Sequence, residues 1–423
     1  AHSGIASLIS VGVSAGVLFA VYKVLPLMDG YLSSIALIGG MTFLVSNLVG
    51  LKQDNARRLL GYSSIGQLGL LTLALALLQQ FEASPAQLVL VIGGLFINHL
   101  LAKAGLFWLA GLIDRVSISD WSVIARRPVL LLLLGTLMTA LVGLPPFPGF
   151  WAKWELIMLL GTDGQYGWIT LVLVGSLLEA AYLFRWFSQA RQGDAESAAT
   201  GTDLRQSAPL LVAAVLLFVV GYGIATTMVS NTVALFLPLF AGLLLWLIDG
   251  LHGRLKALPM LVVVATGGYW LGSELEGINR LFSYLLIGGG LLISIAAMYR
   301  NDDRKGFYPL LAVLLLSLAT LLRAQTSLEF FFSWELMTLS SWLLVTLGRQ
   351  GIMPGLNYLL FSLGSAYFIL AGFAVAYAAT GSIMLADLGS SGDAAAVIFS
   401  LLAAGFIIKM GGFGVHIWLP DAM

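Results

Sequence analysis

Four ionisable side chains interrupt otherwise apolar stretches of this sequence: Lys103, Lys153, Glu335 and Lys409. A charged side chain at the centre of a membrane span costs at least about 2.5–3.5 kcal/mol on insertion scales, so residues of this kind are candidates for function. Lysine and glutamate exchange protons, and a row of such groups joined by histidine or water forms a proton relay. These residue types therefore predict proton transfer inside a membrane.

Lys103 lies near the centre of "LFINHLLAKAGLFWLAGLI". His99 precedes it by four residues, so the two side chains share one face of a helix. A lysine in mid-span cannot easily extend its ammonium to the interface. The alternative is a structural lysine paired with a buried carboxylate.

Lys153 follows a proline-rich stretch in "GLPPFPGFWAKWELIML". Because prolines cannot continue a helix, they break the span and free backbone carbonyls at membrane depth. A broken helix beside a charge is a recurrent ion site in transporters. The alternative is an interfacial lysine supported by Glu155 and by a Trp151/Trp154 aromatic belt.

Glu335 and Lys409 lie in two later apolar stretches, "LEFFFSWELMTLSSWLL" and "FSLLAAGFIIKMGGFGVHIWLP". The glycines after Lys409 weaken its helix, and His416 is seven residues on, about two turns away on the same face. For each charged residue the alternative is a structural role, satisfied by hydrogen bonds between helices. Glu329 is nearer a span end, where an interfacial position is expected.

Glu179 is a fifth buried charge, in "LVGSLLEAAYLFRWF". Arg185 follows it by six residues, which is off the spacing at which two side chains meet on a helix. A relay role and a purely structural role remain equal alternatives for this glutamate.

The composition is that of an integral membrane protein: 59% of the 423 residues are hydrophobic and only 10% are charged. The mean hydropathy is +0.95. The apolar runs are long and lack period-2 alternation, which favours helices over a barrel. The zero net charge gives no sign of nucleic-acid binding. With no cysteine, no Walker P-loop and no GxGxxG after a strand, we expect no cofactor or metal site.

The apolar pattern predicts an all-α fold with about fourteen transmembrane helices, in which the 150–161 piece is half of a broken helix. The basic loops 52–58 and 114–127 should share the cytoplasmic side. The polar segment 191–206 is expected to be a surface loop, and His2 and His252 loop residues. A short polar break near 229 divides the chain into two domains. The predicted spans are 4–25, 32–51, 62–80, 87–114, 128–144, 150–161, 167–188, 208–228, 231–250, 257–273, 281–299, 307–323, 327–347, 355–379 and 394–414.

At these residues the sequence resembles the antiporter-like, proton-translocating membrane subunits of respiratory complex I, membrane-bound hydrogenases and multi-subunit cation/proton antiporters. "FFFSWELMTLSSWLL" resembles the helix with the family's essential glutamate, which implies that role for Glu335. "GFIIKMGGFGVHIWLPDAM" resembles the next signature and implies a central lysine at Lys409. "INHLLAKAGLFWLAG" and "GLPPFPGFWAKWELI" resemble the second half's lysine helix and broken helix, which implies relay roles for Lys103 and Lys153.

The resemblance implies inverted half-modules of about five helices, each with one broken helix. It implies a multi-pass protein of a bacterial inner membrane that moves protons, or Na⁺, together with other membrane subunits. The chain would have no redox centre of its own within a translocating oxidoreductase of the NADH:quinone or hydrogenase type. Two other functions stay open: a stand-alone or paired cation/proton antiporter or bicarbonate-uptake subunit, and an inert membrane scaffold.

The order of the halves is reversed relative to the family. Residues 1–229 resemble a second half-module with two lysines, and residues 230–423 resemble a first half-module with a glutamate and a lysine. We expect a window from a longer protein with two modules in tandem; a circularly permuted module is the alternative. Three departures bear on the relay. The span at 4–25 has no central charge, Gln67 stands where many members have histidine, and Glu179 stands where a small or hydroxyl residue is expected.

Overall fold

The computed structural model describes residues 13–192, 204–251, 253–299, 304–348, 352–412 and 414–422. In these ranges, ten helices are long and apolar enough to cross a membrane, and four shorter apolar helices accompany them. This confirms the predicted all-α, multi-pass membrane fold. Most of the predicted 191–206 loop, the start of the 4–25 span, His2 and His252 lie outside the described residues.

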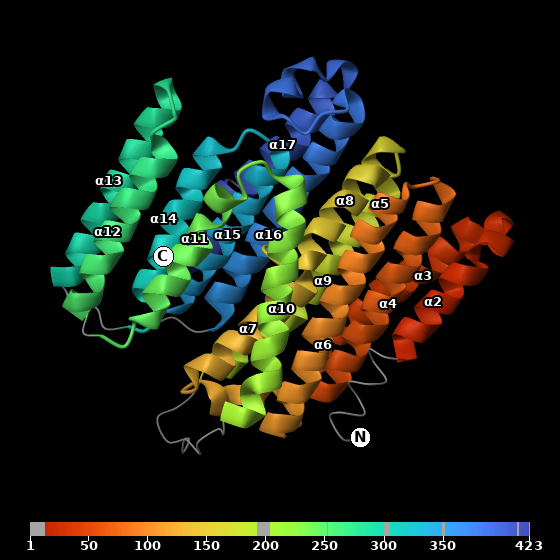
Figure 1. Cartoon of the computed structure of the whole chain (residues 1–423), viewed down its shortest axis with the longest axis horizontal. Helices are drawn as coiled ribbons and strands as arrows, with labels where there is room; N and C mark the ends of the chain where they lie inside the picture. Colours follow the sequence, from red (N-terminus) through yellow and green to blue (C-terminus); the bar gives the residue numbers. More distant parts are fainter. Residues whose placement is uncertain are drawn as a thin grey trace. The chain divides into compact units, whose positions relative to one another are not determined.

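The chain forms two compact units, Ala1–Ala225 and Thr226–Met423. The helices of the first unit pack both with neighbours along the chain and with helices farther away in the sequence (Figure 1). Leu25–Tyr31 forms a 3₁₀ turn between α2 and α3, and Val89–Gly93 forms a π-helical turn that joins α5 to α6. The helices are α2 Ser14–Val24, α3 Leu32–Gly50, α4 Ala56–Gln80, α5 Pro85–Leu88, α6 Gly94–Ile113, α7 Pro128–Val142, α8 Pro148–Thr162, α9 Tyr166–Arg191 and α10 Leu204–Met228.

Helices α3 and α4 approach each other closely through glycines. A Cβ on Gly39 would lie 2.6 Å from the Leu73 backbone nitrogen, and one on Gly69 would lie 2.6 Å from the Phe43 nitrogen. Only residues without a side chain allow this approach, which is the usual way in which helices pack inside a membrane. The pairing fixes α4, the helix that carries several polar side chains of the candidate site.

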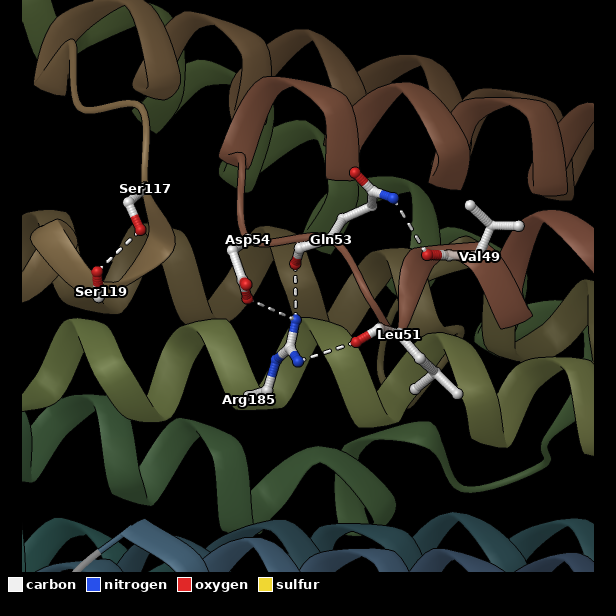
Figure 2. A network of polar contacts seen from close by, with 7 residues as sticks. All are labelled: Val49, Leu51, Gln53, Asp54, Ser117, Ser119 and Arg185. Carbon is white, nitrogen blue, oxygen red and sulfur yellow. Dashed lines mark hydrogen bonds and ion pairs between the residues drawn. The ribbon is translucent and has the colours of Figure 1, made fainter.

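Arg185 of α9 fastens the turn between α3 and α4 (Figure 2). Its guanidinium donates to the carbonyl oxygens of Leu51, at 2.9 Å, and Gln53, at 2.6 Å, and lies 3.5 Å from the Asp54 carboxylate. Asn55 then caps α4 by accepting hydrogen bonds from the first backbone amides of that helix. Arg185 therefore anchors a turn and leaves Glu179 to other partners.

The second unit packs α11, α12, α13 and α14 around a shared apolar core. The α15 helix begins with a capping box, in which Glu329 accepts from the backbone amides of Gln325 and Thr326. Glu329 thus lies in the first turn, near a span end. The helices are α11 Thr232–Leu247, α12 Gly253–Gly272, α13 Gly277–Tyr299, α14 Phe307–Arg323, α15 Ser327–Thr346, α16 Ile352–Thr380, α17 Ala395–Met410 and α18 Trp418–Ala422.

Candidate functional site

The first unit contains a broken helix, as the prolines predict. Helix α7 ends at Val142, and Gly143 follows with a left-handed φ of +82°. Residues 144–147 are not helical, and Pro148 begins α8 at the first helical position, where its missing N–H is not needed. The break leaves the last four carbonyls of α7 without helical partners in a buried position.

Backbone amides and one amide side chain satisfy the first two of these carbonyls. Thr139 accepts from the Leu144 amide at 3.1 Å, and Ala140 accepts from the Gly143 amide at 2.9 Å. Ala140 also accepts from Asn98 Nδ2 at 2.7 Å. Asn98 is buried on α6, so a polar residue inside an apolar helix is accounted for by the break in its neighbour.

Side chains satisfy the last two carbonyls. Leu141 accepts from Gln67 Nε2 at 3.2 Å, and Val142 accepts from Lys153 Nζ at 2.6 Å. Lys153 is largely buried, with 8% of its surface exposed. Because the C-terminal end of a helix carries partial negative charge, the ammonium also meets a favourable field there.

Glu179 of α9 is fully buried beside the break. One carboxylate oxygen accepts from Ser63 Oγ at 2.9 Å and the other from Gln67 Nε2 at 2.6 Å. Glu179 interacts electrostatically with both Lys103 and Lys153. Within the described ranges, no ion pair of 4.0 Å or less joins Glu179 to either lysine.

Lys103 is fully buried on α6. Its ammonium donates to the backbone carbonyl of Leu60 on α4 at 3.0 Å. Ser63, which donates to Glu179, lies one turn farther along α4 and on the same face as Leu60. His99 is also fully buried, one turn before Lys103. The first unit therefore gathers His99, Lys103, Glu179 and Lys153 inside one bundle.

Lys409 lies in the second unit, in the last turn of α17. Its ammonium donates to Thr338 Oγ1 at 3.1 Å, Tyr358 OH at 3.1 Å and Ser362 Oγ at 2.9 Å. It also lies 4.7 Å from the centre of the Tyr358 ring, within cation–π range. The side chain is half-buried in this chain rather than fully buried.

Glu335 is fully buried in the middle of α15. Neither of its carboxylate oxygens has a hydrogen-bond partner among the residues that the structure describes. Lys409 interacts with it electrostatically. Thr338, which accepts from Lys409, lies one turn after Glu335 on the same face of α15. The second unit thus brings the predicted glutamate and lysine into one cluster.

His416 does not share a helix face with Lys409, and that expectation was wrong. Helix α17 ends at Met410 because Gly411 adopts a left-handed φ of +69°, so His416 lies in the segment between α17 and α18. His416 is exposed. Trp418 Nε1 donates a hydrogen bond of 3.1 Å to the carbonyl of Ile408 and holds the start of α18 against the end of α17.

Several polar partners of the charged residues escape the sequence analysis. Each of them is a polar side chain inside an apolar span, which is a signal visible in the sequence. The signal is weak, because serine and threonine side chains in such spans commonly hydrogen-bond to the backbone of their own helix. Spacing alone does not show which of them turn toward a charge. The partners are Ser63, Asn98, Ser176, Thr338, Tyr358 and Ser362. Gln67 is singled out by the sequence as a departure from the family, but its bonds to Glu179 and Leu141 are seen only in the structure.

This chain has lysines and glutamates buried in its apolar helices, and Lys153 lies at a helix break. These features define a class of protein, a multi-pass membrane protein built like an ion transporter. The chain belongs to the NADH:quinone oxidoreductase/Mrp antiporter transmembrane family, whose model matches residues 3–181 and 324–423. The resemblance predicted from the sequence is confirmed.

Curated relatives are bacterial. NADH-quinone oxidoreductase subunit N 1 of Roseiflexus castenholzii is 34% identical over 166 residues, which cover 37% of this chain and 30% of that protein. Subunit N of Rubrobacter xylanophilus is 30% identical over 195 residues, covering 44% of this chain and 40% of that protein. The match thus spans well under half the length of these relatives.

Among solved structures, the Mrp complex from Dietzia sp. DQ12-45-1b resembles this chain with 14% identity and a TM-score of 0.31. The match covers 90% of this chain and 47% of that one.

Proposed function

We propose that this chain translocates protons across a membrane as a subunit of a multi-subunit complex. The observation that carries the proposal is the position of Glu179, which is fully buried and interacts electrostatically with the two buried lysines Lys103 and Lys153. Three titratable groups inside one helical bundle form the kind of row through which protons pass in pumps and transporters.

The physical basis is the high cost of an unbalanced charge in a medium of low dielectric constant. Lys103, Glu179 and Lys153 are close enough for a change of protonation at one to alter the charge preferred at the next. Moving one proton therefore changes the free energy of protonation of the neighbouring groups. A chain of such steps carries protons along the row, and His99 beside Lys103 can extend it.

Glu335 and Lys409 are the corresponding pair in the second unit. Lys409 is bound by three hydroxyl groups, so its ammonium is held in place whether or not Glu335 carries charge. His416 continues the route beyond the end of α17 in this proposal. Residues 1–229 act as the second, Lys/Lys half-module of an inverted repeat and residues 230–423 as the first, Glu/Lys half. The family model matches one stretch in each half.

The partners in this proposal are other membrane subunits, the lipid bilayer and protons. The subunit itself holds no redox centre, and the complex is of the NADH:quinone or hydrogenase type. A second candidate is cation/proton exchange with Na⁺. Lys153 rests on a helix-end carbonyl and a serine hydroxyl, and such oxygen ligands also bind Na⁺ at broken helices.

The test is proton movement into inverted membrane vesicles that contain the complete protein with its partner subunits. The vesicles are energised with NADH or with a Na⁺ gradient, and acidification is followed by a fluorescent dye. Lys103→Ala and Lys153→Ala should each abolish acidification while the protein still inserts at normal levels. Lys52→Ala, at an exposed lysine, is the matched control. Normal acidification by Lys103→Ala overturns the proposal, and the energy source that works separates redox-driven pumping from exchange.

A further inference from the structure

Each unit holds one lysine that donates to a hydroxyl group lying one helical turn from a buried glutamate. We propose that these hydroxyls, Ser176 and Thr338, pass protons between the lysine and the glutamate of their own unit. This inference rests on the proposed proton translocation and names two residues as steps of it. Nothing in the sequence pattern separates these two hydroxyls from the many others in apolar helices.

In the first unit the contact joins α8 to α9. Lys153 Nζ donates to Ser176 Oγ at 3.0 Å. Ser176 lies three residues before Glu179 on α9, so the two side chains share a face of that helix. Both are buried, with exposed fractions of 2% and 0%. A proton that leaves Lys153 through Ser176 is therefore delivered to the face of α9 that carries Glu179.

In the second unit an independent contact joins α17 to α15. Lys409 Nζ donates to Thr338 Oγ1 at 3.1 Å. Thr338 lies three residues after Glu335 on α15 and is fully buried. Both units thus contain a lysine that donates to a hydroxyl group, with a glutamate one helical turn from that hydroxyl. The helices, the hydroxyl residue and the chain direction from hydroxyl to glutamate differ between the units.

A hydroxyl group suits this step because it can accept one proton while it releases another. Lys153 gives a proton to Ser176 Oγ as the serine releases its own proton toward Glu179. The lysine becomes neutral, the carboxylate becomes a carboxylic acid, and the serine is unchanged. Cβ atoms one turn apart on a helix are about 5–6 Å from each other, a gap that one water molecule completes.

Lys153 and Lys409 differ in their other hydrogen-bond partners. We therefore expect the two units to respond differently to the loss of the hydroxyl group. The second acceptor of Lys153 is the Val142 carbonyl, which has no proton to pass on. Within the described residues, Ser176 is thus the one hydrogen-bond partner of Lys153 that can relay. Lys409 has two further hydroxyl partners, Tyr358 and Ser362. Removing the hydroxyl of Ser176 should therefore slow translocation more than removing that of Thr338.

The experiment uses the same vesicles and the complete protein. Ser176→Ala should lower the initial rate of acidification by about tenfold or more, which corresponds to about 1.4 kcal/mol in barrier height. Thr338→Val, which keeps the shape of the side chain, should lower it by a smaller factor, and Thr338→Ser should restore it. Ser188→Ala on the same helix as Ser176, and Thr320→Val on α14, are matched controls at buried residues. Both controls should transport normally.

The outcomes separate this inference from the proposed function. Normal rates for Ser176→Ala, with acidification lost in Lys153→Ala, overturn the inference and leave proton translocation standing. A Thr338→Ser rate as low as that of Thr338→Val shows that packing matters and overturns the role of that hydroxyl. Normal rates for Lys153→Ala overturn the proposed function itself.

Discussion

Lys153 donates a hydrogen bond of 2.6 Å to the carbonyl of Val142, the last residue of α7. The lysine lies on the helix that follows the break, and the carbonyl belongs to the helix that precedes it. One contact therefore satisfies a backbone group that the break exposes and places an ammonium at the negative end of a helix dipole. The lysine stabilises the broken end of α7, and the end of α7 stabilises the charge of the lysine.

Gly143→Ala should displace Lys153 and slow proton translocation. A Cβ at this position would lie 2.9–3.0 Å from the end of the Lys153 side chain, and the residue has a φ of +82°. The left-handed conformation alone costs an L-residue about 1–2 kcal/mol. The measurement is acidification of inverted vesicles, normalised to the amount of inserted protein.

Gly164→Ala is the matched control for that change. Gly164 has a φ of +67°, but a Cβ there would meet nothing within 4 Å. This variant has the same backbone strain without touching Lys153, so its transport should be much closer to normal. Equal losses in the two variants would show that backbone strain, and not the lysine, accounts for the effect.

Gln67→Leu should destabilise the first unit. The amide of Gln67 donates both to the Glu179 carboxylate and to the Leu141 carbonyl, and leucine leaves both acceptors without that donor. A buried acceptor that loses its donor costs about 1–3 kcal/mol. The midpoint of thermal unfolding in detergent should fall. Gln53→Leu, whose amide makes one long contact at 3.4 Å near the surface, should change it little.

Asp249 and Lys256 form a buried ion pair in the second unit, with 3.3 Å between Oδ1 and Nζ. Asp249 also accepts from the Gly306 amide at 2.7 Å, so it joins the ends of three helices. Lys256→Met alone leaves a buried charge unpaired and should cost about 3–5 kcal/mol. The double variant Asp249→Asn/Lys256→Met should be more stable than Lys256→Met, as measured by thermal unfolding.

An exposed pair supplies the contrast. Arg57 and Asp114 lie 2.6 Å apart, but their side chains are 43% and 78% exposed. Replacing Arg57 with alanine should cost less than about 1 kcal/mol, because water already solvates both charges. A similar loss of stability for Arg57→Ala and Lys256→Met would contradict the assignment of the buried pair.

The fold was largely predictable because a membrane leaves few choices. Long apolar runs without alternation must be helices, and the prolines around Pro146 must interrupt one. The structure adds where the broken ends obtain their hydrogen bonds. Gln67 and Asn98 are far from the break in sequence, so only the packing of α4 and α6 shows that they satisfy it.

The site was predictable in its charges and less so in its connections. The cost of burying a charge marks Lys103 and Glu335 in any apolar stretch. The prediction that the helix continues to His416 was wrong, because α17 ends at Met410. Glycines that weaken a helix do not reveal at which residue it ends. The sequence does not single out Ser176, because its partner Lys153 is on another helix.

The most direct test of proton transfer through Glu179 is the transport rate of Glu179→Gln. Glutamine keeps the size of the side chain and can still accept a hydrogen bond from Ser63, but it cannot take up or release a proton. We expect normal insertion and a rate of vesicle acidification reduced by about tenfold or more. Glu179→Gln vesicles that acidify at the rate of the unmodified protein would contradict it, because the two lysines would then exchange protons without the carboxylate between them.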